Sequence, residues 1–175
     1  MEASQIKQIF TRTYNKESDS LFRYCYLRVH DREKAIDIVQ DIFAELWKKM
    51  NGGETIKNER AYLFTLAHNR IIDWYRKKKS ESLDALLEND EGERPFDHPD
   101  ERSETDIILS SEAKSVLKEI DNLEPVYREV LYLRFVEDLS PQEIAMILKI
   151  TPNTASVRIT RGIEKLREKF HTQNK

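Results

Sequence analysis

The sequence SPQEIAMILKITPNTASVRITRGIEKLREKF, at residues 140–170, predicts two helices joined by a very short turn. Ser140 and Glu143 have the spacing of a capping box, in which each residue satisfies a backbone donor of the other. Pro141 suits the first helical position because that position needs no backbone hydrogen bond. Thr151 and Pro152 predict the start of the second helix by the same logic. The stretch therefore predicts a helix-turn-helix.

The second of these helices has an apolar side and a basic side. Apolar residues recur at helical spacing and predict a buried stripe of Ala155, Ile159, Ile163, Leu166 and Phe170. The other side carries hydroxyls and cations, namely Thr154, Ser156, Arg158, Arg161 and Lys165. A helix of this kind fits the major groove of duplex DNA. The alternative is a helical hairpin whose charges only face water.

Composition favours an all-α protein. Of the 175 residues, 35% are charged and 39% hydrophobic, with only four glycines and five prolines, whereas a sheet protein needs more turn residues. We expect a cytoplasmic protein without membrane insertion, because no apolar run has the length of a membrane span and the first ten residues are polar. The single cysteine, Cys25, allows no internal disulfide and no cysteine-based metal site.

The net charge of −3 conceals an uneven distribution. Residues 1–79 hold 16 Lys and Arg against 11 Asp and Glu, residues 80–108 hold 2 against 11, and residues 109–175 hold 11 against 10. The middle segment contains two prolines and too few apolar residues to bury a core of its own. We therefore predict two small helical domains, at 1–79 and 109–175, joined by an acidic flexible linker at 80–108.

Apolar spacing predicts four helices in the N-terminal domain. Residues 6–14 and 21–29 are expected to form two separate helices, followed by a third from about 32 to 50 and a fourth from about 60 to 79. The polar side of the fourth helix carries Asn69, Asp73, Arg76 and Lys77, and aromatic residues lie nearby at Tyr62, Phe64, Trp74 and Tyr75. Cations among aromatic rings suit unstacked bases and phosphates. The alternative is that the cations only complement the helix dipole.

The sequence contains no pattern typical of an enzyme. It has no glycine-rich phosphate loop, and its four histidines are scattered without metal-ligand spacing. Its carboxylates occur in solvated runs rather than as a pair in an apolar pocket. We expect no catalytic residue, no metal and no cofactor, and we interpret the chain as a binding protein.

Three separated stretches together resemble the extracytoplasmic-function (ECF) group of bacterial sigma factors, which keep only the sigma regions 2 and 4. DIVQDIF at residues 37–43 is similar to region 2.2, residues 62–77 resemble regions 2.3 and 2.4, and residues 123–170 resemble region 4. The resemblance implies that region 2 lies at 1–79 and region 4 at 109–175. It also implies a non-enzymatic protein that binds core RNA polymerase, recognises the −10 and −35 promoter elements and promotes promoter melting.

The resemblance also assigns roles to individual residues. Core polymerase would be contacted by Asp37, Gln40, Asp41 and Ala44. The −10 element would be held during melting by Asn69, Asp73, Trp74, Tyr75, Arg76 and Lys77, while the loop 52–58 receives a base flipped out of the duplex. The −35 element would be read by Arg134, Thr154, Ser156, Val157, Arg158, Thr160, Arg161 and Lys165. The implied partners are core RNA polymerase, promoter DNA as duplex and melted strand, and an anti-sigma factor.

Some positions depart from the family pattern. Ser156 stands where a cation is usual, and Lys149 and Asn153 stand where the family often has glycine. A less basic helix predicts weak binding to duplex DNA until polymerase is present. One alternative function is a conventional helix-turn-helix regulator that binds duplex DNA on its own, and another is a helical protein-binding adaptor. Neither alternative explains the basic, aromatic helix at 60–79.

Overall fold

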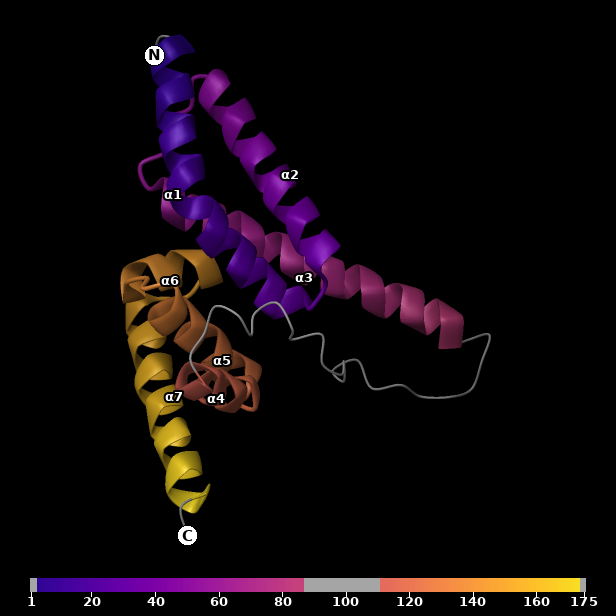
Figure 1. Ribbon diagram of the computed structural model, residues 1–175, viewed down its shortest axis with the longest axis vertical. Coiled ribbons are helices and arrows are strands. Elements are labelled where there is room, and N and C mark those ends of the chain that lie inside the picture. The colour runs from indigo at the N-terminus through magenta and orange to yellow at the C-terminus, as the bar shows by residue number, and fades with distance from the viewer. Residues whose placement is uncertain (1–2, 87–110, 174–175) are drawn as a thin grey trace. The chain divides into compact units, whose positions relative to one another are not determined.

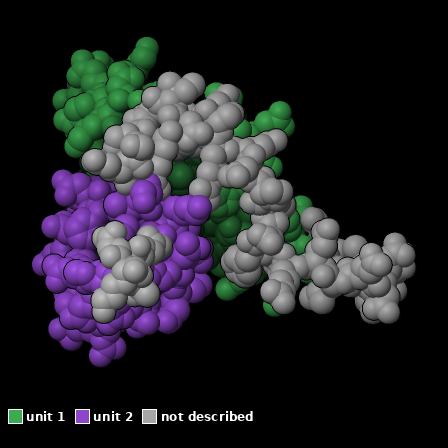
Figure 2. Space-filling model, turned by 60° about the horizontal axis from the view of Figure 1, so that its bottom comes forward, with its two compact units in different colours: residues 1–99 green, residues 100–175 purple. Residues whose placement is uncertain are grey.

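The structure is a computed structural model that describes residues 3–86 and 111–173. Side-chain surroundings are described for 4–79 and 115–171. The described residues form helices and connecting turns, which confirms the predicted all-α class. The chain divides into two compact units, Met1–Pro99 and Asp100–Lys175 (Figures 1 and 2). The boundary between them falls inside the predicted linker at 80–108, most of which lies outside the described residues.

The first helix of unit 1, α1 (Ala3–Val29), is continuous over 27 residues (Figure 1). The prediction of two helices at 6–14 and 21–29 is therefore wrong. The intervening residues 15–20 are polar but include no glycine or proline, so nothing in them stops a helix. Within this stretch Glu17 is buried, because its carboxylate pairs with Arg60 of another helix. A tertiary ion pair thus accompanies the burial of one charged residue in a turn of α1 that is otherwise exposed or half-buried.

The second helix, α2 (Arg32–Asn51), starts at a side-chain cap and ends at a glycine. The Asp31 side chain accepts a hydrogen bond from the Lys34 amide at 2.9 Å, and the Gly52 amide donates to the Lys48 carbonyl at the other end. Gly53 has a φ of +84°, a backbone conformation that favours glycine. The helix packs on α1 through an apolar face of Ala35, Ile38, Ile42, Phe43, Leu46 and Met50.

The third helix, α3 (Glu59–Leu86), begins where Asn58 accepts a hydrogen bond from the Ala61 amide at 2.9 Å. It runs seven residues beyond the predicted end at 79, so the start of the predicted linker has a helical backbone. Its buried face consists of Ala61, Leu63, Phe64, Ala67 and Ile71. This face packs on both α1 and α2, which leaves the opposite side of α3 open to solvent.

Unit 2 contains α4 (Ser111–Asp121), α5 (Pro125–Leu131), a π-helical turn η2 (Tyr132–Val136), α6 (Pro141–Leu148) and α7 (Pro152–Gln173) (Figure 1). The helices α6 and α7 form the predicted helix-turn-helix, and they pack against each other. Both bonds of the capping box are present: the Ser140 amide donates to Glu143 at 2.9 Å, and the Glu143 amide donates to Ser140 at 3.3 Å. The Thr154 amide donates to the Thr151 hydroxyl at 3.1 Å.

The π-helical turn η2 was not predicted. Residues 126–135 have a continuous apolar pattern, which gives no sign that the hydrogen-bonding register changes after Leu131. Here the Glu137 amide bonds to the Tyr132 carbonyl at 3.2 Å, and the Leu139 amide reaches the Leu133 carbonyl at 2.9 Å. The wide turn buries Leu133 and Leu139 while it leaves Phe135 exposed.

Helix α7 lies close to the preceding helices of unit 2. At Gly162 an added Cβ would come within 3.0 Å of the Leu131 side chain, so the absence of a side chain permits this approach. Of the predicted apolar stripe, Ala155 and Ile159 are buried, and Ile163, Leu166 and Phe170 are half-buried. The first half of α7 is therefore anchored on the core by small and branched residues.

The turn of the helix-turn-helix depends on a non-glycine residue in the left-handed region. Lys149 caps α6 with φ 54° and ψ 44°, and its amide bonds to the Ala145 carbonyl. A side chain in this conformation costs about 1–2 kcal/mol relative to the right-handed one, and glycine avoids the cost. The family resemblance, in which glycine is often found here, agrees with this geometry.

We predict that Lys149→Gly raises the free energy of unfolding of unit 2 by about 1 kcal/mol. The measurement is hydrogen exchange of α6 and α7 amides, because Trp47 and Trp74 are both in unit 1 and their fluorescence does not report on unit 2. The control is Met146→Gly, at an exposed right-handed position of α6, which should lower that free energy by about 1 kcal/mol. If Lys149→Gly and Met146→Gly lower the free energy of unfolding equally, Lys149 is not strained by its left-handed conformation.

Candidate nucleic-acid and polymerase interface

The residues predicted to contact polymerase lie together on one exposed face of α2. Asp37, Gln40, Asp41 and Ala44 follow the i, i+3, i+4, i+7 spacing of a helix face, and all four are exposed. The opposite face of α2 carries the apolar residues of the core. The predicted set therefore forms one continuous polar surface, which is here called the α2 face.

Two aromatic residues lie beside the α2 face, and the sequence alone does not assign them to it. Trp47 is 37% exposed and lies three residues beyond Ala44, and Tyr14 of α1 is 46% exposed. They join Phe10 and Phe43 in a cluster, with ring centroids 5.0 Å apart for Phe10–Trp47 and 4.7 Å for Tyr14–Phe43. The position of Trp47 off the apolar stripe was the only available signal, and the sequence does not show that α1 passes beside it.

The polar side of α3 is open over most of its length. Asp73, Arg76 and Lys77 are exposed and Asn69 is half-buried. Arg76 Nη1 lies 3.8 Å from Asp73 Oδ1, with both side chains largely in solvent. Such a surface pair contributes little to stability, so a nucleic-acid phosphate can displace the carboxylate at small cost.

Trp74 and Tyr75, the two aromatic residues predicted to meet the melted strand, make different contacts. Their rings are in edge contact with centroids 4.8 Å apart, and the Lys78 ammonium lies over the Trp74 ring at 5.1 Å. The Tyr75 hydroxyl donates a hydrogen bond to the backbone carbonyl of Arg28, near the end of α1. Tyr75 therefore joins α3 to α1, whereas no such bond is seen for the Trp74 indole among the described contacts.

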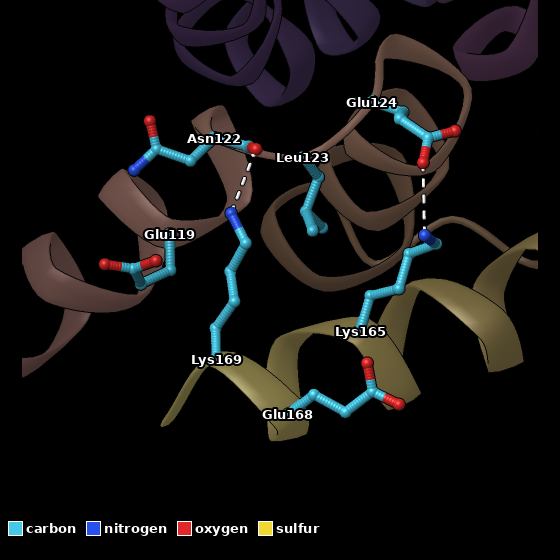
Figure 3. A pocket seen from close by; sticks show the side chains of 7 residues that line it. All are labelled: Glu119, Asn122, Leu123, Glu124, Lys165, Glu168 and Lys169. Atoms are coloured by element: carbon cyan, nitrogen blue, oxygen red, sulfur yellow. Dashed lines mark hydrogen bonds and ion pairs between the residues drawn. The ribbon is translucent and has the colours of Figure 1, made fainter. Parts of the chain in front are cut away.

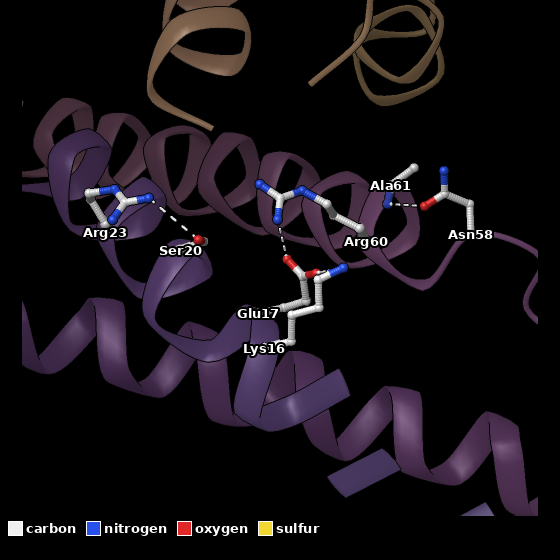
Figure 4. A network of polar contacts seen from close by, with 7 residues as sticks. All are labelled: Lys16, Glu17, Ser20, Arg23, Asn58, Arg60 and Ala61. Carbon is white, nitrogen blue, oxygen red and sulfur yellow. Dashed lines mark hydrogen bonds and ion pairs between the residues drawn. The ribbon is translucent and has the colours of Figure 1, made fainter. Parts of the chain in front are cut away.

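The first turn of α3 is held by α1 through a partly buried ion pair (Figure 4). Arg60 Nη1 lies 2.5 Å from Glu17 Oε2, and Lys16 Nζ lies 3.5 Å from the other oxygen of the same carboxylate. The Arg60 guanidinium also lies over the Phe64 ring at 5.3 Å from its centroid. This pair fixes the end of α3 that follows the loop 52–58.

A second polar network joins α2 to α3, and its residues other than Tyr62 were not singled out by the sequence. Glu45 of α2 accepts hydrogen bonds from the Tyr62 hydroxyl at 3.2 Å and from Arg70 Nη2 at 3.1 Å. Lys49 of α2 pairs with Glu54 of the loop at 3.1 Å. In sequence the charged members of this network are ordinary surface charges. Lys49 and Glu54 are close along the chain, but only the packing of α2 on α3 brings Glu45 to Tyr62 and Arg70.

The exposed side of α7 carries four of the predicted residues. Ser156, Val157, Thr160 and Arg161 are exposed, which is the arrangement that a groove-reading helix needs. The Thr160 hydroxyl donates to the Ser156 carbonyl at 3.1 Å, so its oxygen lone pairs remain available as acceptors. Thr154 and Arg158 are half-buried at the edge of this surface.

Two other predicted cations bind partners within unit 2. Arg134 Nη1 donates to the Leu139 carbonyl at 3.1 Å, across the turn that follows η2. Lys165 Nζ donates to Glu124 at 3.1 Å and lies over the Tyr127 ring, 5.2 Å from its centroid. The hydrogen bond with Glu124 raises the pKa of Lys165 above its ordinary value. Figure 3 shows Lys165 and Lys169 extending from α7 toward Glu124 and the Asn122 carbonyl.

The described part of the chain offers neither a metal centre nor a membrane span. Within it, no group of three or more His, Cys, Asp or Glu side chains is placed to hold a metal ion. The helices of that part are also not long and apolar enough to cross a membrane.

Family comparisons match both units. The family model for Sigma-70 region 2 matches residues 13–81, and the model for Sigma-70, region 4 matches residues 113–166. The chain is 30% identical over 156 residues to the ECF RNA polymerase sigma factor SigW of Bacillus subtilis, with 87% of this chain and 83% of the relative covered. The chain belongs to the ECF sigma factors.

Other relatives agree with this membership. The ECF sigma factor described here is 27% identical over 167 residues to the RNA polymerase sigma factor YlaC of Bacillus subtilis, with 89% of this chain and 92% of YlaC covered. Sigma factors bind core RNA polymerase and promoter DNA and start transcription. The predicted function is thus confirmed, and the alternative of a regulator that acts alone on duplex DNA is not supported.

Solved structures show the same fold. The sigma factor RpoE of Bartonella quintana, in complex with the anti-sigma factor NepR, matches with a TM-score of 0.69 and 24% identity, over 92% of this chain and 96% of that one. CnrH, in complex with the cytosolic domain of CnrY, matches with a TM-score of 0.65 and 20% identity, over 97% and 95% of the two chains. The ECF sigma factor therefore has the helical fold expected from its sequence.

We predict that Tyr75→Phe lowers the free energy of unfolding of unit 1 by about 1 kcal/mol, because the carbonyl of Arg28 loses its donor. Urea unfolding followed by tryptophan fluorescence measures it, since both tryptophans belong to this unit. Tyr14→Phe, at a 46% exposed position, is the control and should change the free energy by a few tenths of a kcal/mol. A similar loss in both variants would show that the bond to Arg28 adds nothing.

Proposed function

We propose that the two units of this sigma factor divide promoter recognition between them. Unit 1, with region 2 at 1–79, binds core polymerase through the α2 face and the −10 element through α3. Unit 2, with region 4 at 109–175, reads the −35 element through α7, and the acidic linker at 80–108 connects the two. The observation that carries this proposal is that each predicted set falls largely on the open side of one helix, whose other side is packed in a core.

The open side of α3 has the chemistry to hold a melted strand. Arg76 and Lys77 supply positive charge for phosphates, and the half-buried Trp74 offers part of a ring for stacking. Asn69 supplies an amide that can both donate to and accept from a base edge. Gly53, exposed and with positive φ, gives the loop 52–58 a place where a flipped base can approach the backbone closely.

The −35 element is best matched by the exposed part of α7. Arg161 is exposed and can pair with a guanine through two hydrogen bonds, while Val157 offers apolar contact to a thymine methyl. Lys165 and Arg134 would have to give up internal hydrogen bonds before they could meet DNA. We therefore assign them chiefly to the support of α7 and of the turn after η2.

We also propose that an anti-sigma factor binds and regulates this protein. The sigma factor RpoE, which has the same fold, is bound to the anti-sigma factor NepR, and CnrH, also of this fold, is bound to the cytosolic domain of CnrY. The α2 face, α3 and α7 are the surfaces that such a protein would have to cover in order to block polymerase and DNA. We further propose that the protein acts in the cytoplasm as an initiation factor with no enzymatic activity of its own.

Reconstitution tests the proposed function. The full chain is mixed with core RNA polymerase and DNA fragments that carry candidate promoters, and run-off transcripts are mapped. The expected result is transcription from defined start sites that depends on the added chain, with weak binding of the free chain to the same duplexes. Failure to produce any start site across promoters of its own genome would contradict the proposal.

We predict that Arg161→Ala lowers initiation at promoters that need the −35 element by about 5- to 150-fold, because one bidentate base contact discriminates by about 1–3 kcal/mol. Competition for core polymerase should be unchanged, since α7 lies in the other unit. Arg167→Ala removes the same charge from an exposed position later on α7 and serves as the control. If both variants initiate equally, Arg161 does not read a base. If Arg161→Ala loses binding to core polymerase, the proposed division of promoter recognition between the two units is wrong.

A further inference from the structure

Glu45 stands where the two proposed binding surfaces of unit 1 meet. On α2 it follows Ala44 directly and lies one helical turn after Asp41, so it borders the α2 face. Its carboxylate accepts from Arg70, which follows Asn69 on α3, and from Tyr62 near the start of the same helix. One side chain thus contacts α3 at two points about two turns apart.

The contacts of Glu45 are partly shielded from water. The Glu45 side chain is 33% exposed and that of Arg70 is 44% exposed, and the two form an ion pair at 3.1 Å. Burial raises the pKa of Tyr62, and the nearby Glu45 carboxylate raises it further. Tyr62 therefore remains a neutral hydroxyl donor at physiological pH.

The network continues from Glu45 into the loop 52–58. Lys49, one turn further along α2, lies over the Tyr62 ring at 5.1 Å and pairs with Glu54 of the loop at 3.1 Å. The Glu54 amide in turn donates to the Lys49 carbonyl at 3.2 Å. The Tyr62 ring is thus held at its hydroxyl by Glu45 and covered on one face by Lys49, which also holds the loop.

We propose that Glu45 is a positioning residue that couples the docking of α2 on polymerase to the capture of the melted strand by α3 and the loop 52–58. This inference rests on the proposed function, because it takes the α2 face as the polymerase contact and α3 as the DNA contact. Docking on polymerase immobilises α2. Because Glu45 of α2 hydrogen-bonds to Tyr62 and Arg70, these two side chains of α3 then become less mobile as well. The strand then meets a surface that is already ordered, so less conformational entropy is lost on capture.

Simple electrostatics makes the opposite prediction. A carboxylate beside a strand-binding surface repels phosphates, so its removal should strengthen DNA binding and speed promoter opening. Positioning predicts that its removal slows opening, because Arg70 and Tyr62 lose the acceptor that holds them. The sign of the effect therefore separates the two roles of Glu45.

The experiment compares the full chain with Glu45→Ala, in complex with core polymerase. Core affinity is measured by competition, and promoter opening by the fluorescence of a 2-aminopurine placed in the −10 element. At saturating holoenzyme, Glu45→Ala should open the promoter about tenfold more slowly, which corresponds to about 1.4 kcal/mol of activation free energy. Its core affinity should stay within about twofold of wild type, because the α2 face itself is unchanged.

Two further variants make the test specific. Glu45→Gln keeps an oxygen that can accept from Tyr62, so it should recover part of the opening rate. Glu33→Ala removes the same charge from an exposed position in the first turn of α2 and should open the promoter at the wild-type rate. If Glu45→Ala does not fold, Tyr62→Phe removes one of the two hydrogen bonds and should slow opening in the same direction.

The outcomes separate this inference from the function on which it rests. Opening by Glu45→Ala at or above the wild-type rate overturns the positioning role. If Glu45→Ala loses core affinity, and this loss accounts for the slower opening, Glu45 is a docking residue and the positioning role is also overturned. A wild-type protein that never opens a promoter with core polymerase overturns the proposed function, and the role of Glu45 falls with it.

Discussion

The functional surfaces of unit 1 depend on how α3 is held. An apolar face packs it against α1 and α2, but apolar packing alone leaves a helix free to slide and rotate slightly. Directional polar contacts remove that freedom: Arg60 pairs with Glu17, the Tyr75 hydroxyl bonds to the end of α1, and Arg70 and Tyr62 bond to Glu45. With α3 fixed on its inner and lateral sides, Asp73, Arg76 and Lys77 remain together on its open side.

Unit 2 uses different contacts for the same purpose. The capping box starts α6, the left-handed Lys149 ends it, and Gly162 lets α7 approach Leu131 closely. Further along, Lys165 and Lys169 bind Glu124 and the Asn122 carbonyl and tie the second half of α7 to the region between α4 and α5. The basic residues of α7 therefore serve two purposes, because the exposed Arg161 is available to DNA while Lys165 holds the helix in place.

The sequence predicted well wherever a feature is local. The capping box of α6, the helix-turn-helix and the open faces of α2 and α7 follow from the spacing of neighbouring residues, and the structure confirms them. Predictions were wrong or incomplete where a distant partner decides. The burial of Glu17 within α1 depends on Arg60 of α3, and the register change at η2 is invisible in an apolar pattern. The roles of the individual site residues stay predictions until they are measured.

By itself, the sequence determined the all-α class, the family and the faces of the helices that stay in water, because helical periodicity and capping act over a few residues. Only the tertiary structure decided which polar side chains are committed to holding the helices. The residues of the Glu45 network come from α2, the loop and α3, and Lys165 is 41 positions from Glu124. Charges so far apart in the chain become partners only when packing brings their helices together, and no periodic pattern in the sequence records that proximity.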